Sequence, residues 1–292
     1  MYDVSGEGWK KHILYGTSKI LKLRGPEAHL TGRGRSFFLT IRVFEICRSI
    51  ILNETSFLAQ GNWQSLMTRM WEGDLADEWH PKEALFSYDI LLSTQPPVCP
   101  ILIHCLKQFS PVHSIWDVFK PDATYLGELL DKTLLDLAED GHALRDALRD
   151  WYDHFQIWLK CGIHPSDDPR SALAAIYYHG ISIYLSGLYD YRPQFNHINA
   201  PSLPFETIQM HVDSILSRTE MALRTTNLAG IMFFFPLRVA GARAVSSNQK
   251  SSILRMLKAI SGRNFVVADA FTQDLSTFWR EKEVAEAQNA RI

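Results

Sequence analysis

The longest stretch without a charged residue runs from Ser171 to Tyr189, between Arg170 and Asp190. As a helix it would be nearly long enough to span a bilayer. It also contains a histidine, several serines and two glycines, and polar side chains are costly in hydrocarbon. We therefore predict a helix that is buried inside an all-α protein, and no membrane span.

Helical periodicity continues in much of the remaining chain. Phe38, Ile41 and Phe44 recur at spacings of three, as on one face of an amphipathic helix. We expect the charged side chains of Glu45 and Arg48 to lie on the other face of that helix.

A stripe of leucines at helical spacing follows further along the chain, with charged residues off it. Its members are Leu126, Leu129, Leu130, Leu134 and Leu137. Another helix is predicted to end at a glycine cap, Gly262. Proline-rich breaks separate these segments, and none is long or polar enough to be an interdomain linker. We predict a single all-α domain over residues 1–292.

The charge balance and the cysteines limit the class of protein. Lys and Arg number 30 against 32 Asp and Glu, a net charge of −2, whereas a surface devoted to nucleic acid needs a basic face. The cysteines, Cys47, Cys99, Cys105 and Cys161, are too scattered for a disulfide framework. With no signal peptide visible, we expect a cytoplasmic protein, with the nucleus as the alternative.

The sequence shows no glycine-rich phosphate loop, dinucleotide fingerprint, nucleophile elbow or His-Glu-x-x-His zinc helix. Three groups could be interpreted as metal ligands, and each is explained at least as well by a solvated loop or helix end. They are Asp167 with Asp168, Asp74 with Asp77 and Glu78, and His154 with Cys161 and His164. We expect no metal and no cofactor.

A helix over Ala147–Lys160 would place His154 between Trp151 and Trp158 on an apolar face. Such surroundings disfavour the charged imidazolium and leave a neutral donor or acceptor for a ligand carbonyl. The alternative is a core histidine that is satisfied by a backbone carbonyl.

The uncharged helix carries its own polar stripe of His179, Ser182, Ser186 and Asp190. A second stripe consists of tyrosines at a spacing of seven, namely Tyr177, Tyr184 and Tyr191. Polar groups in a buried helix must face partners, water or a cavity. Hydrogen bonding between helices and a ligand cavity both remain open.

Short motifs follow one another along the chain. The N-terminal ones are Trp9-x-x-His12-x-x-x-Gly16, Ile20-Leu21-x-x-Arg24-Gly25-Pro26, Phe37-Phe38-x-x-x-Arg42-x-x-Glu45-Ile46, Thr55-Ser56-Phe57-Leu58 and Trp63. The C-terminal ones are Phe235-Pro236-Leu237-Arg238-Val239-Ala240 and Gly262-Arg263-Asn264-Phe265-Val266-Val267-Ala268. In this order the chain resembles the fungal-specific transcription factor domain, the helical regulatory region beside binuclear zinc-cluster DNA-binding modules. The resemblance covers about Gly8 to Trp279.

The zinc module of that family needs six closely spaced cysteines, and this chain has four. No basic linker or heptad repeat precedes the helical region either. We expect that the chain begins partway through the family domain, as a truncated gene model would, and that it does not bind DNA by itself. The resemblance implies a domain that senses metabolites or mediates contacts within a regulator, and it supplies no catalytic residues.

Two functions fit a helical pocket protein without a DNA-binding module. The first is a stand-alone, cofactor-independent cyclase or isomerase of fungal secondary metabolism, such as a Diels–Alder cyclase of a polyketide or terpenoid precursor. Such an enzyme needs only a shaped apolar cavity and a few hydrogen bonds. The alternative is a non-catalytic regulatory protein that senses a metabolite or binds a partner. We prefer the enzyme, because a regulator without a DNA-binding module needs a further partner.

We place the predicted site in a cavity between the helices Ala147–Lys160 and Ser171–Asp190. The catalytic hydrogen bonds would come from His154 and His179. The substrate-binding residues would be Trp151, Trp158, Tyr177, Ser182 and Tyr184. The expected ligand is a small apolar metabolite, and a monomer and a homodimer both stay open.

Overall fold

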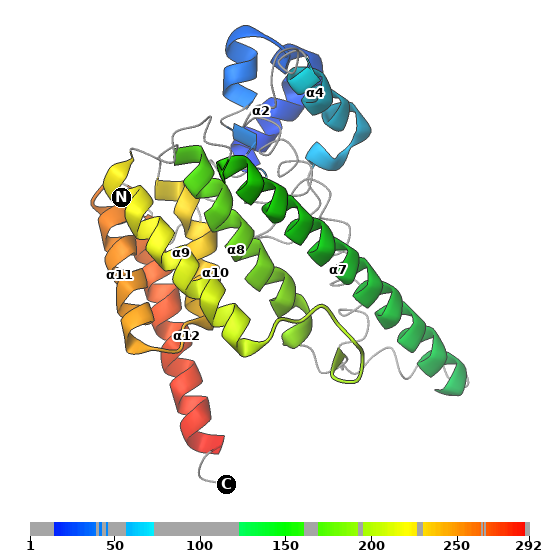
Figure 1. Ribbon diagram of the computed structural model, residues 1–292, viewed down its shortest axis with the longest axis vertical. Helices are drawn as coiled ribbons and strands as arrows, with labels where there is room; N and C mark the ends of the chain where they lie inside the picture. Colours follow the sequence, from blue (N-terminus) through cyan, green and yellow to red (C-terminus); the bar gives the residue numbers. More distant parts are fainter. Residues whose placement is uncertain are drawn as a thin grey trace. The chain divides into compact units, whose positions relative to one another are not determined.

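The computed structural model describes residues 15–38, 41–42, 45, 57–72, 123–160, 169–191, 195–226, 230–263, 265 and 267–289. In these ranges the regular structure is helical and no strand occurs (Figure 1). The prediction of an all-α fold is confirmed. The 3-10 helices are η2 (Pro26–His29), η3 (Phe57–Ala59) and η5 (Gly230–Phe233). The α-helices are α2 (Gly16–Arg24), α4 (Gly61–Glu72), α7 (Ala123–Lys160), α8 (Pro169–Asp190), α9 (Phe205–Thr225), α10 (Phe234–Arg243), α11 (Ser247–Ser261) and α12 (Val267–Asn289).

The chain divides into two compact units, and each is described by itself. The first unit comprises Met1–Cys47, Gln156–Tyr184 and Leu203–Ile292. The second unit comprises Arg48–Phe155 and Leu185–Ser202. Our expectation of a single domain over residues 1–292 stays a prediction.

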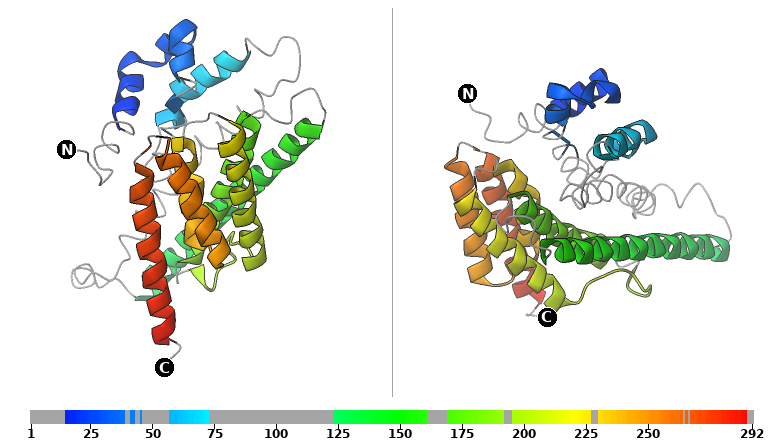
Figure 2. Two further views of the ribbon diagram at one scale, coloured as in Figure 1. Left: turned by 90° about the vertical axis from the view of Figure 1, so that its left-hand side faces the viewer. Right: turned by 45° about the horizontal axis from the view of Figure 1, so that its top comes forward.

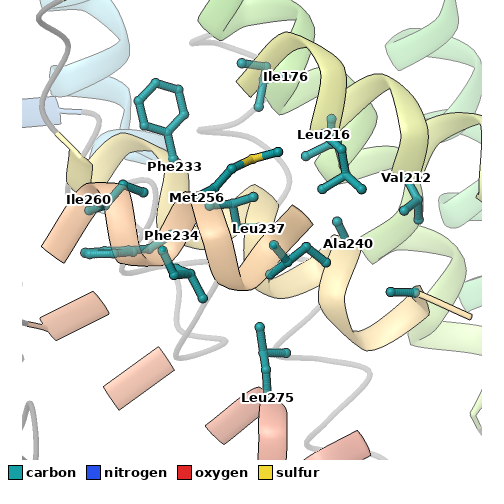
Figure 3. Packing of buried hydrophobic residues seen from close by; sticks show 14 of the residues in the cluster. Ile176, Val212, Leu216, Phe233, Phe234, Leu237, Ala240, Met256, Ile260 and Leu275 are labelled. Carbon is teal, nitrogen blue, oxygen red and sulfur yellow. The ribbon is translucent and has the colours of Figure 1, made fainter. Parts of the chain in front are cut away.

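The core of the first unit is built around α10, which contacts both α9 and α12. Figure 2 shows α9 (yellow), α11 (orange) and α12 (red) side by side in both views. Figure 3 shows the side chains of Phe234, Leu237 and Ala240 of α10 among those of the neighbouring helices. Each of these three side chains is at most 2 % exposed, and burial of such apolar area is the main stabilising term in folding.

Helix α8 contains the uncharged stretch and is buried as predicted. Ile176, Ile181 and Ile183 are each at most 1 % exposed. Among the described helices, none combines the length and the apolar character that are needed to cross a membrane.

Helix α9, which borders the candidate site, is held at its C-terminal end by the turn after α11. The guanidinium of Arg263 donates hydrogen bonds to the backbone carbonyls of Leu223 and Thr226. The last carbonyls of a helix have no partner within the helix, and they give its C-terminal end a partial negative charge. The Arg263 cation therefore also interacts favourably with the helix dipole. Arg263 belongs to the Gly262-Arg263 motif of the sequence, which thus has a structural role.

The other end of α11 is fixed by a capping box. Ser246 Oγ accepts from the Gln249 backbone N–H, and Gln249 Oε1 accepts from the Ser246 backbone N–H. The Gln249 amide also donates to Gln209 and Asp213 of α9. As predicted, α11 ends at Gly262, although this glycine keeps a right-handed conformation with φ −62°.

Helices α10 and α12 approach closely at Gly241. A Cβ added there would lie 2.6 Å from Leu275 Cδ2 of α12. One turn further along α12, Trp279 Nε1 donates a 2.8 Å hydrogen bond to the Gly241 carbonyl oxygen. The missing side chain of Gly241 therefore permits both the packing of Leu275 and the anchoring of Trp279.

The predicted leucine stripe and the helix predicted over Ala147–Lys160 are parts of one continuous helix, α7. Leu134 and Leu137 are buried, each 4 % exposed, in line with the stripe. The other leucine side chains of the stripe lie outside the described residues, as do all four cysteines.

In the second unit, α7 is tied to the last turn of α8 and to the segment that follows it. The Tyr189 hydroxyl donates to the Leu137 carbonyl at 2.9 Å, and Arg145 Nε donates to the Pro201 carbonyl at 2.8 Å. The Tyr189 phenol crosses α7 at Gly141, where an added Cβ would collide with its oxygen. A glycine in mid-helix is intrinsically unfavourable, and here it provides the room for this buried tyrosine.

The N-terminal part of the first unit contains α2, η2 and a helical segment over residues 32–38. His29 is fully buried, and its Nδ1 lies 3.2 Å from the Gly34 carbonyl oxygen. Further on, the sequence prediction for Glu45 was wrong. This side chain is 0 % exposed, and Arg42 one turn earlier is only 9 % exposed. Charged groups are buried only where other polar groups compensate them, and a helical repeat cannot show such compensation.

Candidate functional site

The most unusual group in the described core is a pair of buried histidines. His179 of α8 and His211 of α9 are 5 % and 4 % exposed, and their Nδ1 atoms lie 2.7 Å apart. Two ring nitrogens at this distance can share only one proton, so one Nδ1 donates and the other accepts. The pair therefore joins α8 to α9 by a direct hydrogen bond between side chains.

The sequence brings His211 to this place through the apolar stripe of α9. Ile208, Val212 and Ile215 are buried on that face, and His211 lies at helical spacing with them. His211 was not among the site residues that were predicted from the sequence. The sequence did contain a signal for this residue, namely a histidine that lies among apolar residues at spacings of three and four.

The surroundings of the pair keep His179 uncharged. Burial, and after it the electrostatic repulsion from the nearby His211 and Arg218, together lower the pKa of His179 to about 3. The ring of Tyr178 meets both imidazoles in edge-on geometry, with centroids 5.1 Å and 5.8 Å away. At neutral pH His179 can thus donate and accept hydrogen bonds but carries no charge.

The two serines of the polar stripe bond within α8. Ser182 Oγ donates to the Tyr178 carbonyl at 2.8 Å, and Ser186 Oγ donates to Asp190 Oδ2 at 3.0 Å. Both are contacts between residues four apart, as expected for serines inside a helix. These bonds favour the structural interpretation of the stripe for the serines, and the contact with His211 favours it for His179.

Two of the predicted wall residues meet at one aromatic side chain. The rings of Tyr177 and Tyr184 lie 5.8 Å and 6.0 Å from the ring of Phe235 in α10. Gly180 lies between the two tyrosines in sequence, and a Cβ there would be 3.3 Å from the Phe235 ring. The Phe235-Pro236 motif of the sequence is thus part of the contact between α8 and α10.

The remaining predicted site residues lie on α7. Trp151 is 7 % exposed and stacks on Phe155, with centroids 5.1 Å apart and planes 11° apart. The side chains of His154 and Trp158 lie outside the described residues. The predicted cavity between the two helices therefore stays a prediction.

The three groups considered as metal ligands in the sequence also fall outside the described part of the chain, apart from the helical backbone at His154.

The histidine pair predicts that acid destabilises the first unit. His179 has a pKa of about 3 in the folded chain against 6.5 in the unfolded chain. Between these pH values the unfolded chain binds more protons at this histidine than the folded chain does. The contribution of His179 to the free energy of unfolding is therefore fully present above pH 6.5 and is lost as the pH drops toward 3. The expected loss is about 1.4 kcal/mol per pH unit, or about 2 kcal/mol at pH 5. Urea unfolding followed by circular dichroism at several pH values measures it.

The matched comparison is the double variant His179→Leu/His211→Leu, which should lose this part of the pH dependence. The exposed His197→Gln variant should keep the wild-type slope. Equal slopes in the wild type and the double variant would contradict the assignment.

Comparison with known proteins gives the family. The model of the fungal specific transcription factor domain matches residues 1–287. Over 62 residues the chain is 39 % identical to the uncharacterized protein AN5342 of Emericella nidulans, which is 21 % of this chain and 13 % of that protein. The chain thus spans only a small part of this relative's length. No solved structure matches. The resemblance drawn from the sequence motifs is confirmed, and the chain belongs to the family of the fungal specific transcription factor domain.

Proposed function

We propose that this chain is a regulatory domain in transcription that works by binding rather than by catalysis. The family match over residues 1–287 carries the proposal, because the family's description assigns it to transcription factors. The cyclase or isomerase that we preferred from the sequence has no support in this family, and the non-catalytic alternative is closer to it.

The described site residues support the same choice. His179 bonds to His211, Ser182 bonds to its own helix, and Tyr177 packs on Phe235. Each of these side chains thus makes a contact within the fold, as most buried polar groups do, although Nε2 of His179 is buried without a hydrogen-bond partner among the described residues. A histidine that acts as a general acid or base needs a pKa near the working pH, and the pKa of His179, about 3, argues against that role.

The family's role in transcription also favours the nucleus as the place of action. A small apolar metabolite as the signal and a homodimer as the working state both remain parts of the proposal. We expect no sequence-specific DNA binding by this chain alone, because its net charge of −2 does not suit a phosphate backbone.

A reporter experiment tests the regulatory role. Residues 1–292 are fused to an unrelated DNA-binding domain that enters the nucleus, and transcription is measured from a promoter carrying its sites. We expect the fusion to change transcription relative to the DNA-binding domain alone. A fusion with Trp279→Ala, which should strongly destabilise the first unit, tests whether the change in transcription requires the folded chain.

Unchanged transcription with a folded, nuclear fusion would overturn the regulatory proposal. Turnover of a linear polyketide or terpenoid precursor by the purified chain would instead support the cyclase. The reporter assay and the turnover assay are separate measurements, so each proposal can fail without the other.

A further inference from the structure

Helix α2 exposes an apolar face. Leu23 is 86 % exposed and Ile20 is 46 % exposed. The opposite side of the helix is buried at Ser18 and Leu21, which are 5 % and 0 % exposed. The exposed leucine and isoleucine therefore lie on a helix that is already anchored by its other face.

Cations border this face on both sides. At 100° per residue, Lys19, Leu23, Ile20 and Arg24 follow one another around about 140° of the helix surface. The two apolar side chains are in the middle of this arc, and Lys19 and Arg24 are at its edges; all four are exposed. We call these four residues the α2 face.

The charge of the surrounding segment is strongly positive. Residues 15–38 contain five cations and a single acid, Glu27, although the whole chain has a net charge of −2. The cations are Lys19, Lys22, Arg24, Arg33 and Arg35. Such a local excess attracts an acidic partner and repels a basic one.

We propose that the α2 face binds an acidic amphipathic segment of a partner protein. The apolar residues of the partner would cover Ile20 and Leu23, and its carboxylates would pair with Lys19 and Arg24. An apolar centre inside a charged rim is the usual anatomy of a protein interface. Phosphate groups would satisfy the cations but would leave Leu23 in water. The proposal does not depend on the role in transcription.

A labelled peptide tests the α2 face. The probe is a fluorescein-labelled peptide of about 20 residues, with Asp and Glu on one helical face and Leu and Phe on the other. Its fluorescence anisotropy is titrated with the full chain at low and at high salt. We expect saturable binding that weakens with salt. The variant Leu23→Ser and the double variant Lys19→Glu/Arg24→Glu should each lower the affinity for the peptide by about tenfold.

Matched control variants change the same residue types elsewhere. Leu135→Ser replaces a leucine that is 51 % exposed on α7, and Arg280→Glu reverses an exposed charge on α12. Both should bind the peptide as the wild type does. Circular dichroism of every variant checks the fold, and the exposure of Leu23 makes a folding defect unexpected.

Three results would overturn the proposal. The first is no binding of the acidic peptide, and the second is binding that the α2 variants and the control variants alter equally. The third is that vesicles of phosphatidylserine and phosphatidylcholine, or a DNA duplex, bind through Leu23 and Lys19 while the peptide does not. In that case the face would belong to a membrane or to nucleic acid.

Discussion

Replacing Trp279 by alanine is expected to lower the free energy of unfolding of the first unit by about 3–5 kcal/mol, as for other buried aromatic truncations. The indole is 6 % exposed and donates to the Gly241 carbonyl of α10 at 2.8 Å. Lys250 Nζ of α11 lies 5.6 Å from the ring centroid. One side chain of α12 thus contacts two other helices, and its loss leaves a cavity between them. Guanidinium unfolding followed by circular dichroism measures the change.

Two variants separate the parts of this effect. Trp279→Phe keeps an aromatic ring but removes the N–H donor, and should cost about 1–2 kcal/mol. Phe278→Ala changes the neighbouring residue of α12, which is 39 % exposed, and should cost about 1 kcal/mol or less. Equal losses for Trp279→Ala and Phe278→Ala would show that the contact with Gly241 does not anchor α12.

The second large effect is expected at Gly141 of α7. Gly141→Ala should destabilise the second unit by about 2–3 kcal/mol through overpacking, although alanine is the better helix former. The added Cβ would collide with the Tyr189 hydroxyl and lie 2.7 Å from Pro201 Cγ. Tyr189 is 1 % exposed and cannot turn away without losing its bond to the Leu137 carbonyl.

A double-mutant cycle measures the contact itself. Tyr189→Phe removes the colliding oxygen together with its hydrogen bond, so Gly141→Ala/Tyr189→Phe should cost about 1 kcal/mol less than the sum of the single variants. Gly61→Ala, at the start of α4 with no atom within 4 Å of the added Cβ, is the matched control. Additive free energies in the cycle would contradict the close approach of Tyr189 to Gly141.

The helical part of the fold could be predicted because its signals are local. An uncharged stretch bounded by Arg170 and Asp190 leaves a buried helix as the simplest structure, and α8 extends over it. The limits of α7 were not predictable in the same way. The leucine stripe and the helix over Ala147–Lys160 were predicted as separate segments. Gly141 lies between them, and the tyrosine that makes a glycine useful there is 48 positions away in the chain.

The candidate site shows the same limit for side-chain partners. The polar stripe of α8 was visible in the sequence, but the partner of His179 is 32 residues away on α9. A one-dimensional pattern gives the face on which a residue lies but not what is opposite to it. Glu45 illustrates the converse error, because its charge suggested solvent while the fold buries it completely.

Helix α12 continues beyond Trp279, and residues 280–288 are all exposed. In these turns Lys282 and Glu286 approach to 4.0 Å, and Lys250 of α11 reaches Glu283 at 2.8 Å. Exposed ion pairs of this kind add little stability. The last turns can therefore fray and re-form while the bundle stays folded. We expect Trp279 to be the boundary where such local opening ends and cooperative unfolding of the first unit begins.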